Sequence, residues 1–400
     1  MTSPKQLLRT QLKIWLLAFL TPLLLASQCN APATPPLPAT QAGPVIRVAL
    51  LTPEAGELAP FGRMMRNGIT MAFEEWNNQG GVLDHRIEWA TYETGCEFET
   101  AQQAVQQAVA DGIGFIIGPL CSEAAIAAAE EAEAANVLMI SPTATHPLVT
   151  VNSQGQTRPT VFRISHAYPA QGQAAARFAK ETLEAGKAAL LTYPNDDYAR
   201  ALANAFAEQF SQQGGAISNR AIYTPGDIDF TEQLMAIRNS GAEIIYLPAP
   251  VQIVNQVADQ LKELTASNTM PSPAPILLGS DSWESPELDF EATDGSYFTT
   301  HFAGPDSGPM TETWAEAYKS NYAIEPETLA VLGYDAALVL LTAIQQAGTI
   351  DPLTVANSLK HGTFDGITGK ISFDSQHNPI KPVPIMAIKA GQVSNVTAQP

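Results

Sequence analysis

A serine at the start of a small-residue run is the side chain best placed for chemistry in this sequence. Ser122 follows Gly118-Pro119-Leu120-Cys121 and opens residues 122–135, which are rich in alanine and typical of a helix. The N-terminus of a helix has unpaired backbone N–H groups and the positive end of the helix dipole, so it can bind a small carboxylate. A plain N-cap is the alternative role for Ser122. The segment indicates binding rather than catalysis.

Motifs of enzymes are missing from the sequence. It has no Gly-x-Ser-x-Gly elbow, Walker A loop, Gly-x-Gly-x-x-Gly turn or His-Glu-x-x-His pair. The six histidines are dispersed along the chain: His85, His146, His166, His301, His361 and His377. We therefore expect no enzymatic activity, no cofactor and no metal site.

The first 28 residues have the pattern of a secretory signal. Lys5, Arg9 and Lys13 precede an apolar run over residues 14–25, and small residues follow it. A run of about a dozen apolar residues is short for a membrane span. We expect residues 1–28 to be a signal peptide and the protein to be exported; an uncleaved signal anchor is the alternative.

A lipid anchor is predicted directly after the signal. Cys29 follows Leu25-Ala26-Ser27, which resembles the lipobox of bacterial lipoproteins, although Gln28 stands where those signals usually have Gly or Ala. Residues 29–44 are rich in Pro, Ala and Thr and are expected to form an extended tether. The predicted location is the periplasm or the outer face of the cytoplasmic membrane.

Export also bears on the other two cysteines. Cys96 and Cys121 are expected to pair in an oxidising compartment, and a loop of that size contributes about 3 kcal/mol in the chain-entropy model. Two buried free cysteines are the alternative.

Composition predicts a globular protein with an acidic surface. Hydrophobic residues make up 45% of the 400 residues and charged residues 15%, which is enough apolar material for two domains. The formal net charge of −19 repels nucleic acid and anionic lipid, so a nucleic-acid partner is excluded.

Strand-like and helix-like runs alternate from residue 46 onward, which is the pattern of a parallel α/β sheet. Two series of strands are expected, at residues 45–51, 87–92, 113–117 and 137–140, then at 188–192, 221–223, 243–247 and 276–278. Residues 161–165 are expected to make the first crossover between the two lobes. The last strands, 370–373 and 385–388, are expected to close the second lobe.

Five motifs together give the chain a resemblance to type I periplasmic binding proteins of ABC importers, most closely the leucine/isoleucine/valine-binding group. They are Asn77-Asn78-Gln79-Gly80-Gly81, the spacing of Cys96 and Cys121, Gly118-Pro119-Leu120-Cys121-Ser122, Ile140-Ser141-Pro142-Thr143-Ala144-Thr145 and Gly333-Tyr334-Asp335-Ala336. The resemblance implies two α/β lobes, each a mostly parallel sheet flanked by helices, joined by three crossovers. We assign residues 45–165 and 302–368 to lobe 1, and residues 166–301 and 369–400 to lobe 2.

The resemblance also implies which residues hold a ligand between the lobes. An amino acid's α-carboxylate is bound by Ser122 and Thr145, with the backbone at Thr143 beside them. Asp281 binds the ammonium from the end of a second-lobe strand, where ligands of open α/β sheets bind; a solvated turn aspartate is the alternative. Two aromatic side chains, Tyr198 and Phe61, cover the apolar part of the ligand or are ordinary half-buried aromatics.

Two positions bear on specificity. Pro248-Ala249-Pro250 stands where branched-chain binders of this group have an aromatic residue, so the side-chain pocket differs. His146 either contacts a polar ligand side chain or forms a local hydrogen bond.

The sequence thus predicts a monomeric, exported solute-binding protein that captures an amino acid and delivers it to an ABC permease and ATPase complex. The alternative is a receptor subunit of the same fold that senses an amide, urea or an amino-acid derivative, because function depends on the site and the partners rather than on the fold.

Overall fold

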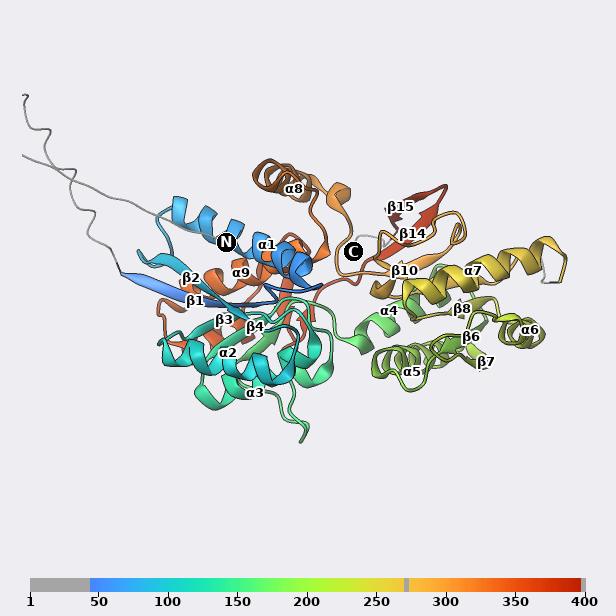
Figure 1. Cartoon of the computed structure of the whole chain (residues 1–400), viewed down its shortest axis with the longest axis horizontal. Helices are drawn as coiled ribbons and strands as arrows, with labels where there is room; N and C mark the ends of the chain where they lie inside the picture. Colours follow the sequence, from blue (N-terminus) through green and yellow to red (C-terminus); the bar gives the residue numbers. More distant parts are fainter. Residues whose placement is uncertain (1–43, 270–272, 397–400) are drawn as a thin grey trace, which may run out of the picture. The chain divides into compact units, whose positions relative to one another are not determined.

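The computed structural model describes residues 44–269 and 273–396. The predicted signal peptide, the lipidation site Cys29 and residues 29–43 of the predicted tether lie outside the described residues. The described chain contains two α/β lobes, each a sheet with helices on both faces (Figure 1). We call these lobes the first layer and the second layer. The predicted α/β class is confirmed.

The first sheet is entirely parallel and has the strand order β2-β1-β3-β4-β5. Its strand β1 is an inner strand and is buried on both faces: Val48 and Leu50 face one core cluster, whereas Ala49 and Leu51 face another. The strands are β1 (Val45–Thr52), β2 (Arg86–Glu93), β3 (Phe115–Ile117), β4 (Leu138–Ser141) and β5 (Val161–Arg163). The helices in contact with this sheet are α1 (Ala59–Asn78), α2 (Phe98–Ala110), α3 (Ser122–Ala135), α9 (Thr328–Ala347) and α10 (Pro352–His361). A further helix, α8 (Pro309–Tyr322), packs against α1.

The second sheet has the order β15-β14-β10-β9-β8-β6-β7 and is mixed, since β14 runs antiparallel to β10 and to β15. Its strands are β6 (Lys187–Thr192), β7 (Ala216–Ile222), β8 (Ile244–Tyr246), β9 (Ile276–Gly279), β10 (Tyr297–Thr299), β14 (Ile385–Lys389) and β15 (Gln392–Asn395). Its helices are α4 (Tyr168–Glu181), α5 (Asp197–Gln212), α6 (Thr231–Ser240) and α7 (Val251–Ala266). Alternate residues of β6 again face two cores, with Leu190 in one and Leu191 in the other.

A small antiparallel sheet corrects the predicted position of residues 370–373. It consists of β11 (Phe364–Gly366), β12 (Gly369–Phe373) and β13 (Pro379–Ile380). Ile371 and Phe373 belong to the core cluster of the first sheet rather than to the second lobe. The cause is the β11–β12 hairpin, which the buried Asp335 carboxylate holds by accepting the N–H groups of Ile367 at 2.7 Å and Thr368 at 3.0 Å.

The chain passes between the two layers three times, through segments that we call the crossovers. The first joins β5 to α4 over residues 164–167, the second leads from β10 toward α8 over residues 300–308, and the third joins β13 to β14 over residues 381–384. The third passage therefore follows β12 and β13 instead of preceding them.

Close packing of α1 against α9 explains the glycine in the Gly333-Tyr334-Asp335-Ala336 motif. A Cβ at Gly333 would lie 2.3 Å from the Met65 carbonyl oxygen, so the two helix backbones meet here.

Among residues 44–269 and 273–396, α9 is the one helix long and apolar enough to cross a membrane, and most of it is buried inside the protein.

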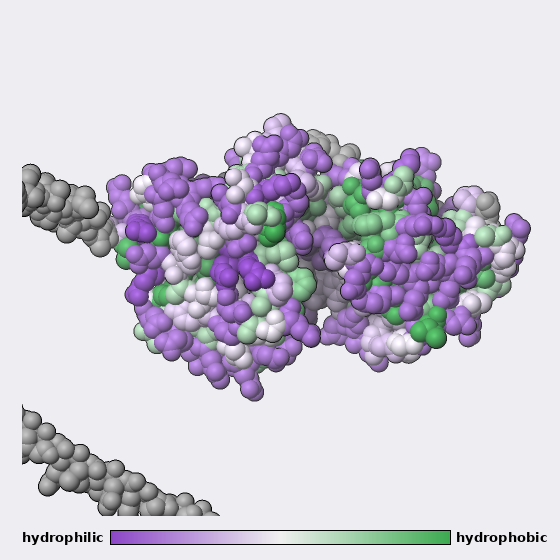
Figure 2. All heavy atoms as spheres, turned by 45° about the horizontal axis from the view of Figure 1, so that its top comes forward, coloured by the Kyte–Doolittle hydropathy of each residue, from purple (hydrophilic) through white to green (hydrophobic). Residues whose placement is uncertain are grey.

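The surface differs in character from these cores. Hydrophilic residues cover most of the face drawn in Figure 2, and hydrophobic residues appear there as small patches. Such a distribution is expected for a face in contact with water.

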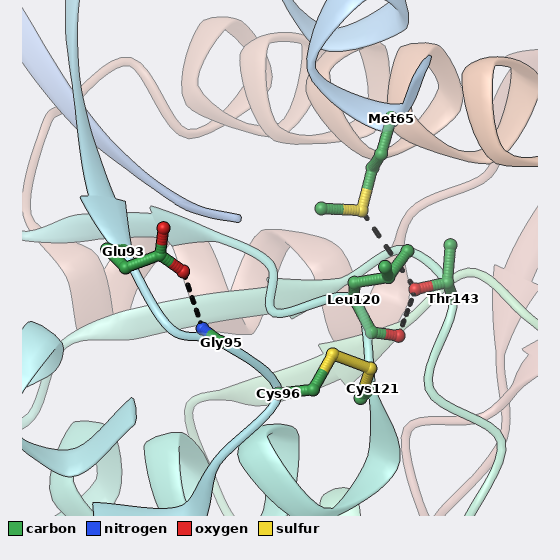
Figure 3. Close-up of a disulfide and its surroundings, with 7 residues drawn as sticks. All are labelled: Met65, Glu93, Gly95, Cys96, Leu120, Cys121 and Thr143. Atoms are coloured by element: carbon green, nitrogen blue, oxygen red, sulfur yellow. Dashed lines mark hydrogen bonds between the residues drawn. A yellow bond between two sulfur atoms is a disulfide. The ribbon is translucent and has the colours of Figure 1, made fainter. Parts of the chain in front are cut away.

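Cys96 and Cys121 form a disulfide that ties the loop after β2 to the residue before α3 (Figure 3). Their Cα atoms are 5.3 Å apart, and the bond closes a loop of 25 positions. The bond therefore fixes the start of α3, which carries Ser122.

Loss of this disulfide is expected to lower the free energy of unfolding by about 3 kcal/mol, because the unfolded chain regains the conformational freedom of the closed loop. Urea unfolding with and without a thiol reductant measures the difference. The double variant C96S/C121S is the control and should be insensitive to the reductant. An unchanged midpoint on reduction of the wild type would contradict the expectation.

Candidate functional site

A cleft of about 570 Å³ is lined by residues from both layers of the fold. Phe61 of α1 and Thr143, which follows β4, come from the first layer, whereas Asp281 and His301 come from the second. A larger surface hollow of about 870 Å³ lies beside α7, but none of the candidate ligand residues lines it. The cleft is therefore the better candidate for a functional site.

Asp281 opens the short helix η2 (Asp281–Trp283) at the end of β9. One carboxylate oxygen accepts a hydrogen bond from the Tyr198 hydroxyl. The other lies 2.9 Å from Nε2 of His301. The Ser280 hydroxyl lies 2.9 Å from the oxygen of Tyr198 and supports that ring in turn. The structure thus brings Asp281 and Tyr198 together, and it does not place Asp281 in a solvated turn.

A buried tryptophan, Trp283, holds the turn that carries Asp281. The indole Nε1 of Trp283 donates to the Leu247 carbonyl at 3.0 Å, and the Ser282 hydroxyl donates to the Ala249 carbonyl at 2.9 Å. A Cβ at Gly279 would lie 2.1 Å from the indole ring, so glycine is required there. The Pro248-Ala249-Pro250 segment therefore supplies one backbone carbonyl, that of Ala249, to this turn.

The electrostatics of Asp281 favour an ionised carboxylate. Burial alone would raise its pKa, but hydrogen bonds from His301 and Tyr198 outweigh burial and lower the pKa below the usual value. At neutral pH the site presents a negative charge toward the cleft. An ammonium group is the natural partner for such a charge.

Ser122 is not the N-cap of α3, which was the alternative to carboxylate binding. Cys121 occupies the N-cap position of α3, and Ser122 is the first helical residue. Its Oγ accepts the backbone N–H groups of Thr145 and His146, at 3.3 Å each. The Thr143 hydroxyl donates to the Leu120 carbonyl at 2.6 Å (Figure 3). These bonds join the loop after β4 to the start of α3.

The same loop is held from inside by a buried guanidinium that sequence reasoning missed. Arg163 donates to the carbonyls of Ala144 at 3.2 Å and Pro147 at 3.1 Å, and to the Thr150 hydroxyl at 3.0 Å. Burial lowers the pKa of Arg163 to about 9. Three acceptors drawn from one loop give that loop a fixed shape, and with it the position of Thr145.

Tyr168 is the second residue that sequence reasoning missed. Its hydroxyl interacts with the hydroxyls of Ser122 and Thr145, and burial raises its pKa against their opposing effect. Its ring packs edge-on against Tyr198, with centroids 5.0 Å apart. Tyr168 therefore connects the predicted carboxylate site to the Tyr198–Asp281 pair. Its position directly after the first crossover was the available signal.

His146 forms a local hydrogen bond. Its Nδ1 accepts the N–H of Leu148 at 3.1 Å and caps the short helix η1 (Pro147–Val149). Burial lowers the pKa of His146. The local alternative is thus the one that the geometry favours.

Comparison with known proteins gives the family. Residues 45–392 match the family model described as periplasmic binding protein. The chain belongs to the periplasmic binding protein family. The predicted resemblance is thereby confirmed, and the family is one of substrate-binding proteins.

Three relatives illustrate the likeness. The leucine-, isoleucine-, valine-, threonine- and alanine-binding protein of Pseudomonas aeruginosa is 27% identical, covering 84% of this chain and 88% of the relative. A solved leucine-binding protein of Thermotoga maritima is 32% identical with a TM-score of 0.71, covering 88% and 98%. A branched-chain amino acid transporter substrate-binding protein of Streptococcus pneumoniae, solved with isoleucine, is 25% identical with a TM-score of 0.70, covering 88% and 99%.

Metal-binding side chains are not grouped within the described ranges. No cluster of three or more His, Cys, Asp or Glu residues suited to a metal ion occurs among residues 44–269 and 273–396.

A second carboxylate of the cleft links the two layers. Glu284 accepts hydrogen bonds from the hydroxyl of Thr300, which follows β10, and from that of Thr328 at the start of α9, the latter at 2.7 Å. Burial raises the pKa of Glu284 to about 8. Many protein atoms surround the Glu284 side chain, but part of it is exposed to water. Water therefore screens the carboxylate and reduces the effect of its pKa shift on stability.

Replacement Glu284→Gln is expected to flatten the pH dependence of stability. An unfolded glutamate titrates near 4.5, so between pH 4.5 and about 8 the folded state binds more protons at this position. The free energy of unfolding therefore falls as pH rises through that window, and Gln removes the fall. Urea unfolding at pH 5 and pH 8 measures it.

Glu287→Gln is the matched control, because Glu287 is exposed on the same segment and should leave the pH dependence as it is. If Glu284→Gln and the wild type lose the same stability between the two pH values, Glu284 is not the group responsible.

Proposed function

We propose that this protein is an extracytoplasmic solute-binding protein that captures an amino acid of the branched-chain type and delivers it to an ABC importer. The observation that carries the proposal is the Asp281 carboxylate, which is kept ionised and lines a cleft shared by both layers of the fold. The names of the relatives, several of which bind leucine, isoleucine or valine, point the same way.

The two ends of an amino acid have opposite charges, and groups suited to both are available: Asp281 lines the cleft. Ser122 and Thr145 are linked to Asp281 through Tyr168 and Tyr198. Asp281 receives the ammonium. The hydroxyls of Ser122 and Thr145 and the N-terminus of α3 receive the carboxylate, since unpaired N–H groups and the helix dipole favour an anion there. The hydroxyl of Tyr168 lies beside this pair and adds a third donor.

The apolar part of the ligand requires an apolar wall. Phe61, Phe302 and Leu332 line the cleft, and Phe61 is 44% exposed, so its ring is free to cover a ligand side chain. Because Asp281 belongs to one layer and Ser122 to the other, one bound molecule contacts both. Closure of the layers on the ligand is then favoured, since only that state satisfies both contacts.

Export and anchoring complete the proposal. Residues 1–28 direct secretion, Cys29 carries the lipid, and residues 29–44 tether a monomeric binding protein near its permease and ATPase. These features are supported by the sequence pattern described above.

A thermal-shift screen of residues 31–400 tests the proposal, because a ligand that binds only the folded state raises its stability by about 2.7 kcal/mol at 100 times its dissociation constant. We expect leucine, isoleucine and valine to raise the melting temperature. The matched probes are isovalerate, which lacks the ammonium, and isoamylamine, which lacks the carboxylate. Stabilisation by amides or urea alone would support the sensor alternative and overturn the amino-acid site.

Reciprocal variants are expected to separate the two ends of the site. Asp281→Asn should weaken leucine binding by about 1 to 3 kcal/mol through loss of a charge-assisted pair, and Ser122→Ala should weaken it by a similar amount. Titration calorimetry measures both.

The probes supply the control for these variants. Binding of isovalerate should suffer in Ser122→Ala and change little in Asp281→Asn. Equal losses for leucine and isovalerate in Asp281→Asn would show that Asp281 does not bind the ammonium.

A further inference from the structure

His301 makes a hydrogen bond at each of its ring nitrogens. Nδ1 lies 3.2 Å from the backbone N of His166, and Nε2 lies 2.9 Å from the Asp281 carboxylate. The side chain is buried, with 5% of its surface exposed. The bond to Asp281 helps to keep that carboxylate ionised, and the bond to His166 has no role yet.

The two bonds determine where the ring carries its proton. A backbone N–H can only donate, so Nδ1 of His301 accepts and has no proton. The proton of the neutral ring is then on Nε2, which donates to Asp281. The Asp281 carboxylate gains an oriented donor without gaining a cation, so its charge is left for the ligand.

His166, the partner of His301, is held in turn by the third crossover. The His166 ring stacks on the His301 ring at 5.6 Å, and its Nε2 donates to the Pro382 carbonyl at 3.1 Å. His166, His301 and Pro382 belong to the first, second and third crossovers. Asp281 is therefore bonded to a cluster in which all three connections between the layers meet.

We propose that His301 is a positioning residue for ligand binding: the His166 N–H fixes its tautomer, and its Nε2–H orients the Asp281 carboxylate toward the ligand's ammonium. This inference rests on the proposed function, in which Asp281 receives that ammonium. His301 also lines the cleft, but in this role it acts through Asp281.

Other ionisable and polar groups also face Asp281 or its histidine partners. Tyr198 faces it from α5, Tyr168 from α4, Tyr246 from β8 and Glu284 from the end of η2. Gln171 of α4 also faces the carboxylate and lowers its pKa. Burial, with Lys381 nearby as a smaller cause, lowers the pKa of His166 well below its usual value and keeps that ring neutral. Of these groups, only His301 is an imidazole bonded to Asp281.

Two substitutions separate the two bonds of His301. His301→Gln keeps a donor near the position of Nε2 and loses the acceptor for the His166 N–H. His301→Asn keeps an acceptor near the position of Nδ1 and loses the donor to Asp281. A role confined to filling space would make the two variants behave alike.

The first measurement needs no ligand. ¹⁵N spectra of the histidine rings, with His301 assigned from its loss in His301→Asn, should show a protonated Nε2 and an unprotonated Nδ1 at neutral pH. A ¹³C titration of the Asp281 carboxyl should show a higher pKa in His301→Asn and a nearly unchanged one in His301→Gln. A protonated Nδ1, or an unchanged Asp281 titration in His301→Asn, overturns the proposal.

The second measurement uses leucine. Removal of one hydrogen bond to a charged group in His301→Asn should weaken binding roughly tenfold, with His301→Gln close to the wild type. The loss of binding on acidification should begin at a higher pH in His301→Asn, because Asp281 protonates earlier. Equal weakening in both variants, with no change in this pH profile, overturns the positioning role.

Failure of the proposed function has a different outcome. If the wild type binds no amino acid, the proposed function is wrong. The titration of Asp281 without ligand then decides by itself whether His301 orients that carboxylate.

Discussion

An ionised carboxylate that has lost most of its water must find replacement donors, and Asp281 finds them on two different elements. Tyr198 comes from α5 and His301 from the end of β10, and both reach a residue at the end of β9. The turn under Asp281 depends on Trp283, which bonds to the chain after β8. The second layer is thus organised around one charge, and the cost of leaving that charge unpaired constrains four neighbouring segments.

In the first layer, side-chain hydrogen bonds fix the shape of the loop between β4 and η1. Ser122, Thr143 and Arg163 each bond to the chain between β4 and η1 or to the turn before α3. Backbone N–H and C=O groups of this loop that have no partner in a strand form hydrogen bonds with side chains instead. Tyr168 then joins this loop to the Asp281 network through the edge-on contact of its ring with Tyr198, so the two layers are connected near the site.

Residues that lie at strand ends or helix starts could be predicted from the sequence, because position along a strand or helix is a local property. Ser122 is of this kind, and the α/β class followed from the alternation of strand-like and helix-like runs. Asp281 was predicted from the family resemblance, which placed an acid at the end of a second-lobe strand. Tyr168, Arg163 and His301 could not be found in this way, since their roles depend on partners far away in the chain, such as Asp281 for His301. Residues 370–373 were assigned to the wrong layer for a related reason: a hairpin has the same local pattern in either layer, and the buried Asp335 that holds it lies on α9.

The path of the third crossover has a consequence for the order in which the protein can assemble. Strand β14 is made last but one, and its residues Ile385 and Met386 lie in the two cores of the second layer. The first layer likewise waits for α9, whose residues pack into a core begun by β1. A chain emerging from the ribosome therefore cannot complete either core until nearly all of it has been synthesised. Late completion of both halves is compatible with the proposed export, in which the chain would cross a membrane before it folds.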